Sequence, residues 1–489
     1  MPRAQRTPKR VGSRRKPRGT RMPLLYDTLK PIIGVALRWY YRSLTTANLE
    51  RIPRDGPVFL AANHPNSLTD AMVVGWASRR RVRFTAKATL FTNPLSARFL
   101  RAVGVLPLRR AADERTDNAR AGDGTAGTVA ASPIADAARN AASFSAVADA
   151  MLDGSCVVVF PEGKTTDDPF LSPIRTGLAR MALMARDERG VRGIRIVPIG
   201  LLFERKEEPR TRILLQVGDP IALDDLATTP NMVASLTDLI EQRLRAVTLN
   251  FESDDDAERI RLVSETLLAM VEPTTSVEEG APSLALTMSL VRRITRAQQT
   301  LRARQDPVLS ARADEFEHRL RNFRARLQSE GIDVHDIGID CSVAPGVRFA
   351  VRELALAAIM LPISAWGRLT HGLPLRLARA LALRNVTARD EPPMRTFIFG
   401  LVLVLSAYVA LTTAVAIAVG PWWALVFLAT LIPSASSDLR YSDRMKRSRA
   451  RARAYGRFRR DLSLQQRLLA EADWLRAEAG ALERLVTAA

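Results

Sequence analysis

The sequence predicts an α/β domain with a mixed sheet covered by helices, followed by a helical region and a C-terminal transmembrane hairpin. Three observations support this prediction. Apolar, strand-like runs alternate with helical patterns between Pro57 and Ala222. After Asp225 the strand signals stop, and charged amphipathic helical patterns replace them. The stretch from Phe397 to Gly420 has 24 residues and no charged side chain, which is long enough to cross a hydrocarbon layer of about 30 Å.

The composition narrows the class of partner and the compartment. Lys and Arg total 72 against 51 Asp and Glu, and this net charge of +21 favours an anionic partner. The basic residues gather in the first 22 residues and between Arg440 and Arg460, beside membrane-like segments. Charge placed in this way favours membrane lipids of an anionic leaflet and predicts no nucleic acid as partner. The only cysteines, Cys156 and Cys341, indicate neither a metal site nor a disulfide framework, which suits a reducing compartment.

The chain divides into seven predicted segments. Residues 23–47, the second segment, have a helical pattern with apolar and aromatic residues on one side and basic residues on the other. This pattern is typical of a helix at a membrane surface. The segments are a disordered basic tail (1–22), this amphipathic helix (23–47), an α/β domain (48–230) with a mobile loop (111–139), a helical extension (231–345), an apolar helical or interfacial segment (346–392), the transmembrane hairpin (393–437) and a basic segment with a C-terminal helix (438–489).

A strand that ends in a polar corner is the predicted centre of the chemistry. Pro57 to Ala62 reads as a buried strand and a helix begins near Ser67, so Pro65 holds His64 in the loop between them. Asp70 falls in the first turn of that helix, where its carboxylate can face the imidazole. A carboxylate on one ring nitrogen leaves the other free to take a proton from a hydroxyl. The alternative is a plain strand–turn–helix corner with an exposed histidine.

Three further stretches follow or close predicted strands, where ligands bind in open α/β sheets. In the first, a glycine turn at Gly104 enters a strand that delivers Arg109 and Arg110, two cations able to hold a phosphate. The second is Phe160-Pro161-Glu162-Gly163-Lys164-Thr165, directly after a buried strand. The third, Val197-Pro198-Ile199-Gly200, closes another predicted strand.

These stretches, in this order, resemble the four motif blocks of the glycerolipid acyltransferase superfamily. The resemblance covers Asn48 to Ile221 and includes Asn63 to Asp70 and Phe160 to Gly163. Members of the superfamily acylate glycerol-3-phosphate or lysophosphatidic acid from a thioester donor. Five residues separate the motif His and Asp here, where the common motif has four. The longer spacing resembles the branch related to bacterial and yeast glycerol-3-phosphate or dihydroxyacetone-phosphate acyltransferases.

The resemblance implies a membrane-bound O-acyltransferase of phospholipid synthesis without a cofactor or a metal. It would transfer a fatty acyl group from acyl-CoA or acyl carrier protein to glycerol-3-phosphate or a related phosphorylated glycerol. Lys164 and Arg175 are the weaker site candidates, since either can be a simple exposed cation. The implied site residues are His64 (base), Asp70 (its partner), Arg110 (phosphate contact), Glu162 and Gly163 (shape of the acceptor site), and Lys164 and Arg175 (anion contacts).

Two other functions stay open at this point. One is acyl transfer to 1-acylglycerol-3-phosphate or another lysophospholipid, and the other is a non-catalytic membrane scaffold with the same fold. The positive-inside rule bears on orientation, because Arg389 and Arg395 precede the hairpin and the Arg440 to Arg460 block follows it. Both flanks, and with them the α/β domain, are therefore expected on the cytoplasmic face of the membrane.

Overall fold

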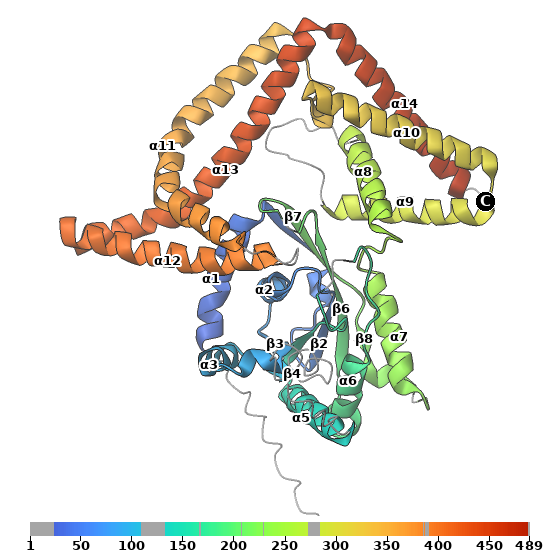
Figure 1. Cartoon of the computed structure of the whole chain (residues 1–489), viewed down its shortest axis with the longest axis vertical. Helices are drawn as coiled ribbons and strands as arrows, with labels where there is room; N and C mark the ends of the chain where they lie inside the picture. The colour runs from blue at the N-terminus through green and yellow to red at the C-terminus, as the bar shows by residue number, and fades with distance from the viewer. Residues whose placement is uncertain are drawn as a thin grey trace, which may run out of the picture.

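The structure is a computed structural model that describes residues 24–108, 133–165, 168–206, 208–227, 229–271, 284–384, 386 and 391–487. It consists of an α/β unit and a long helical region that extends from it (Figure 1). The predicted basic tail (1–22), residues 111–132 of the predicted loop, and Arg109 and Arg110 lie outside the described residues.

The α/β unit is built on one mixed sheet, as predicted. The strand order is β1-β7-β6-β2-β5-β3-β4, and β8 pairs with β6. Strands β2, β3, β4, β5 and β6 run parallel to one another, whereas β7 and β8 pair antiparallel with β6. The strands are β1 (Ser43–Ala47), β2 (Val58–Ala62), β3 (Val82–Lys87), β4 (Leu106–Leu108), β5 (Cys156–Val159), β6 (Arg195–Phe203), β7 (Arg212–Val217) and β8 (Ile221–Ala222).

Helices cover both faces of this sheet and bury its alternate side chains. On one face α5, α6 and α7 enclose a core with strand residues such as Phe59 and Val157. On the other face α1 and α2 enclose a second core with Leu60 and Val158, which Phe397 from the C-terminal part of the chain joins. The helices of this unit are α1 (Leu24–Tyr40), α2 (Leu68–Ala77), α3 (Pro94–Ala102), α5 (Pro133–Leu152), α6 (Gly177–Asp187) and α7 (Met232–Arg245).

Three expectations about this unit need correction. The N-terminal helix ends at Tyr40, and residues 43–47 of the expected helical segment form edge strand β1, which pairs in parallel with β7. Residues 133–139, expected in a mobile loop, belong to helix α5. Strand β6 runs on to Phe203, so Val197 to Gly200 lies in the middle of a strand and does not close it.

The helical region contains no strand among its described residues, as expected. Its core collects buried side chains from α8, α10, α13 and α14, including Phe316, Phe323, Phe458 and Leu468. Figure 1 shows α10 and α14 running side by side at the top of the molecule, where α11 and α13 also meet. The helices are α8 (Asp254–Val271), α9 (Leu284–Arg304), α10 (Pro307–Glu330) and α14 (Leu462–Thr487), with a short turn η4 (Val334–Asp336).

In the described part of the chain, three helices, rather than the two of the expected hairpin, are long and apolar enough to cross a membrane. They are α11 (Val343–Ala382), α12 (Glu391–Val419) and α13 (Pro421–Arg460). The turn between α12 and α13 lies at Gly420, whose φ of 110° suits glycine. The segment expected as short or interfacial is part of α11, which continues through Pro362 and Pro374. Likewise α13 does not end at residue 437 but continues through the basic block.

A buried carboxyl in the helical region offers a test of this packing. Asp336 is 8% exposed, and burial together with nearby Asp333 raises the pKa of Asp336 to about 6. A folded pKa above the unfolded value means that stability falls as the pH rises from about 4 to 6. Asp336→Asn should therefore stabilise the protein by about 1–3 kcal/mol at pH 7.5, seen as a higher thermal midpoint in detergent. The gain should shrink at pH 5; equal gains at both pH values would contradict this account.

Candidate active site

The site is centred on the corner between β2 and α2. The strand ends at Ala62, the helix begins at Leu68, and the loop between them contains His64. Asp70 lies in the first turn of α2, so its carboxylate points back toward the loop. His64 Nδ1 lies 2.9 Å from Asp70 Oδ2, which is a hydrogen-bonding distance. The two groups therefore form the pair that the spacing predicted.

Asp70 is enclosed by protein, and its carboxylate accepts a second hydrogen bond besides the contact with the imidazole. Its side chain is fully buried, and the same oxygen, Oδ2, also accepts the backbone N–H of Asn66 at 2.7 Å. Burial raises the pKa of Asp70, although the hydrogen bond and the positive charge available on His64 oppose that shift. A carboxylate in this position orients the imidazole and can stabilise the imidazolium that forms when the ring takes up a proton.

Glu162 supports the loop that carries His64. This side chain is 4% exposed and follows β5, the strand that pairs with β2. Its Oε1 accepts the backbone N–H of His64 at 2.7 Å and its Oε2 accepts that of Ser172 at 3.2 Å. Burial raises the pKa of Glu162, while these two hydrogen bonds lower it. Glu162 thus joins two loops at the same edge of the sheet and fixes the backbone on which the imidazole stands.

The imidazole itself is held in place and yet reachable. The ring of Phe160 stacks on it, with centroids 3.9 Å apart and planes 15° from parallel. The His64 side chain is 19% exposed, and within the described part of the chain its Nε2 has no hydrogen-bond partner. With Nδ1 on Asp70 and one face covered, the ring offers Nε2 as its free position.

The structure places the other predicted site residues as follows. Gly163 adopts a φ of 76°, which an L side chain tolerates poorly, and its N–H bonds the carbonyl of Phe160. Lys164 and Arg175 are exposed. The backbone N–H of Arg175 donates to the carbonyl of Pro161 at 2.8 Å, so the backbone of Arg175 lies beside the turn that contains Glu162. Arg110 lies outside the described residues, just beyond the end of β4.

Sequence reasoning did not assign roles to several residues that shape this site. Phe160 stacks on the imidazole and Asn66 donates its N–H to Asp70, as described above. Asn63 ties the corner to β6, because its side chain donates to the carbonyl of Leu201 at 3.1 Å and accepts the N–H of Leu201 at 2.7 Å. Asn63 and Asn66 flank His64-Pro65 in the sequence, and this polar spacing was the only available signal. Among the described residues, no cluster of His, Cys, Asp and Glu is arranged to hold a metal ion.

Comparison with known proteins identifies this part of the chain. Residues 43–202 match the acyltransferase family model. An uncharacterized acyltransferase of Schizosaccharomyces pombe is 24% identical over 264 residues, which cover 41% of this chain and 39% of that protein. The chain thus carries an acyltransferase domain over residues 43–202.

Two more relatives are glycerol-3-phosphate O-acyltransferases 2 and 1 of Saccharomyces cerevisiae. The first is 38% identical over 85 residues, covering 17% of this chain and 11% of the yeast protein. The second is 31% identical over 103 residues, covering 19% and 14%. The chain therefore spans well under half the length of these relatives. The crystal structure of a 1-acyl-sn-glycerophosphate acyltransferase from Thermotoga maritima aligns with a TM-score of 0.33 and 17% identity, over 46% of this chain and 78% of that one.

Proposed function

We propose that this protein is a membrane-bound O-acyltransferase of phospholipid synthesis, with His64 as its general base. It transfers a fatty acyl group from acyl-CoA or acyl carrier protein to glycerol-3-phosphate or a related phosphorylated glycerol. The observation that carries the proposal is the 2.9 Å contact between His64 and the buried Asp70, with Nε2 left free at the carboxyl end of β2. The names of the two yeast relatives support this acceptor.

The reaction proceeds in a single acyl transfer without a covalent enzyme intermediate. Nε2 of His64 takes the proton of the acceptor hydroxyl as the hydroxyl oxygen attacks the thioester carbonyl carbon. Asp70 stabilises the imidazolium that forms. The carbon–sulfur bond then breaks, the new ester forms, and the departing thiolate receives the proton from His64. Arg110 holds the acceptor phosphate, and the exposed Lys164 and Arg175 add positive charge near the same edge of the sheet.

The proposed setting is the cytoplasmic face of a membrane with an anionic leaflet. Three long apolar helices support a membrane location, and basic residues concentrate at their flanks and along the last part of α13. Positive charge of this kind stays on the cytoplasmic side during insertion. The α/β unit packs directly on α12 through Phe397, so it lies on the same side as the N-terminal end of that helix.

An acyl-transfer assay with a panel of acceptors tests the proposal. Purified protein is incubated with labelled acyl-CoA, or acyl carrier protein, and with glycerol-3-phosphate, dihydroxyacetone phosphate, lysophosphatidate or lysophosphatidylcholine. We expect the phosphorylated glycerol to be the preferred acceptor. Preference for a lysophospholipid would reassign the acceptor, and no transfer to any member of the panel would favour a membrane scaffold.

The proposed phosphate contact gives a separate prediction. Arg110→Ala should raise the KM for the acceptor by more than the KM for the acyl donor, because only the acceptor phosphate would lose its cation. The control is Arg101→Ala, at an exposed arginine in the last turn of α3, which has no role in the proposed site. Steady-state kinetics with each substrate varied in turn measures both values. Equal effects on acceptor and donor would contradict the role proposed for Arg110.

A further inference from the structure

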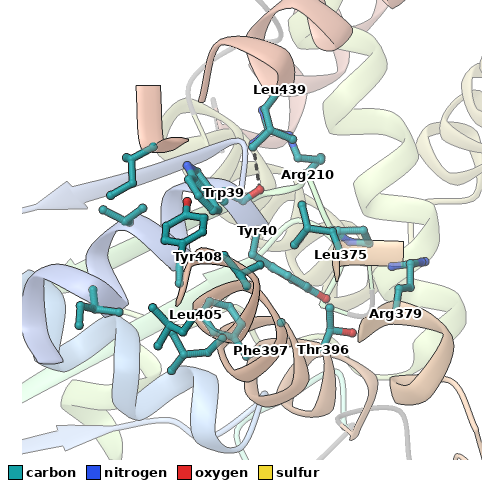
Figure 2. A pocket seen from close by; sticks show the side chains of 18 of the residues that line it. Trp39, Tyr40, Arg210, Leu375, Arg379, Thr396, Phe397, Leu405, Tyr408 and Leu439 are labelled. Carbon is teal, nitrogen blue, oxygen red and sulfur yellow. Dashed lines mark hydrogen bonds between the residues drawn. The ribbon is translucent and has the colours of Figure 1, made fainter. Parts of the chain in front are cut away.

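A cavity outside the candidate active site lies between α1 and the three long C-terminal helices. It has a volume of about 490 Å³, is partly open, and is lined mainly by apolar side chains (Figure 2). Val35 of α1 and Val404 and Leu405 of α12 contribute to this lining. The volume falls in the range of about 300–1,000 Å³ that is usual for cavities that bury one small ligand.

Three polar groups of the lining lie together on one side of this cavity. Figure 2 shows the hydroxyl groups of Tyr40 and Thr396 and the guanidinium of Arg379 on the same side, away from Leu405. Burial raises the pKa of Tyr40 to about 12, and the positive charge of Arg379 acts against that rise, which is consistent with a guanidinium near the phenol. The cavity is thus apolar in its body and cationic at one margin.

The two arginines of the lining differ in what they already bind. Arg210 pairs with Asp443 and donates to the carbonyl of Trp39 at 3.3 Å. Arg379 is exposed, and none of the residues that the structure describes forms an ion pair or hydrogen bond with its side chain. Of the two arginines in the lining, Arg379 is therefore the one whose guanidinium can bind an anionic ligand.

The location of the cavity decides which ligand can gain from binding there. Three of the four helices around it are candidate membrane spans, so acyl chains are the apolar groups at hand. An acyl chain gains little by exchanging lipid for an equally apolar cavity. A preference of the cavity for one lipid over others must then come from its polar margin, where a phosphate can contact Arg379 and the hydroxyls of Tyr40 and Thr396. The volume suits one chain better than the two chains of a diacyl lipid.

The cavity also lies close to the active-site corner. Tyr40, which lines it, stacks edge-on against Tyr41, and the Tyr41 hydroxyl accepts the side-chain N–H of Asn66 at 3.5 Å. On α12, Met394 contacts the Ser67 hydroxyl at 3.9 Å, only two residues before Thr396. A lipid in the cavity would therefore lie beside the loop that carries His64.

We propose that this cavity binds the acyl chain of a single-chain anionic phospholipid, with Arg379 beside its phosphate. Such a lipid has the chemistry of the product of the reaction proposed above. The suggestion that the cavity holds that product rests on the proposed function, whereas the binding itself does not. The residues that build the site, in α1, α11, α12 and α13, lie outside the segment that matches the acyltransferase family.

Photo-labelling of the full chain tests this site directly. The probe is a lysophosphatidate with a diazirine at the end of its acyl chain, added to the protein in lipid nanodiscs, and labelled residues are mapped by mass spectrometry. We expect label on the cavity side of α1 and α12. Unlabelled lysophosphatidate should compete at least tenfold better than lysophosphatidylcholine with the same chain, and glycerol-3-phosphate should not compete.

Two pairs of variants provide matched controls. Gly400 lines the cavity, and a Cβ there would meet only Ala378 Cβ at 4.0 Å, so Gly400→Leu should enter the cavity and lower labelling at least fivefold. Val402→Leu, at a residue that is 57% exposed on the same helix, should not. Arg379→Gln should weaken binding at least tenfold, whereas Arg376→Gln, at an exposed arginine that does not line the cavity, should not.

The outcomes separate this inference from the proposed function. Equal label on the outer face of α12, or label unaffected by Gly400→Leu, would indicate lipid around the protein and overturn the site. Equal competition by lysophosphatidylcholine would overturn the role of Arg379, and competition by glycerol-3-phosphate would overturn the acyl-chain site. His64→Ala should label like the unchanged protein, because binding needs no turnover. Specific labelling without acyl transfer would refute the proposed function alone.

Discussion

His64→Ala is expected to lower acyl transfer by about 10²–10⁴-fold, the usual contribution of a positioned general base. The loss should appear mainly in kcat, because the imidazole acts on the acceptor proton as the new bond forms. The measurement is the transfer rate from labelled acyl-CoA at saturating acceptor. The side chain is small, partly exposed and stacked on one ring only, so we expect the fold to persist.

A second histidine serves as the control for this experiment. His318 is exposed on α10, and among the described residues its side chain hydrogen-bonds with Asn322 of the same helix alone. His318→Ala should keep full activity and the thermal midpoint of the unchanged protein. If His64→Ala retained its acyl-transfer activity while both variants stayed folded, the domain would use a base other than His64.

The elements that local sequence specifies well are those that position the site. The apolar run of β2 and the proline after His64 were sufficient to predict a strand, a loop and a helix with Asp70 in its first turn. These features depend on neighbouring residues and on the burial of a central strand, which leave a clear pattern. The acyltransferase domain could be identified for the same reason, since its blocks each follow a strand.

The features that sequence reasoning missed depend on contacts between distant residues. Strand β1, Ser43–Ala47, has a weak local pattern and exists because it pairs with β7, about 170 residues later. The contacts of Glu162 with the backbone of His64, and of Phe160 with its ring, join residues almost 100 positions apart. No local pattern encodes such pairs, so the resemblance could name Glu162 as a residue that shapes the acceptor site but not as the one that holds the backbone of His64.

Pro362 in α11 led to a wrong expectation for a different reason. A proline inside a helix removes one backbone hydrogen bond, and the sequence around Pro362 therefore indicated a short or interrupted segment. In the structure α11 packs along α13 so closely that a Cβ at Gly367 would collide with the backbone of Ser434. Neighbouring helices at such close range let an apolar helix continue through proline. Tertiary packing therefore decided the number of long apolar helices.

Asp70→Asn is expected to lower kcat by about 10²-fold or more while leaving the fold intact. Both hydrogen bonds to this side chain, from the His64 ring and the Asn66 N–H, are accepted by Oδ2. Within the described residues Oδ1 has no partner. The amide can thus place its oxygen at the Oδ2 position and its NH₂ group at the Oδ1 position. The variant keeps the orientation of the imidazole and removes only the charge that stabilises the imidazolium.

The stability of this variant separates a chemical role from a structural one. Burial raises the pKa of Asp70, so the ionised carboxylate costs stability at neutral pH, and this cost is absent at a pH low enough to protonate Asp70. Asparagine removes the cost, and the thermal midpoint of Asp70→Asn at pH 7.5 should equal or exceed that of the unchanged protein. Asp149→Asn, at an exposed aspartate on α5, is the control and should change neither quantity. Loss of activity together with a lower midpoint would mean that Asp70 holds the corner together rather than supporting the base.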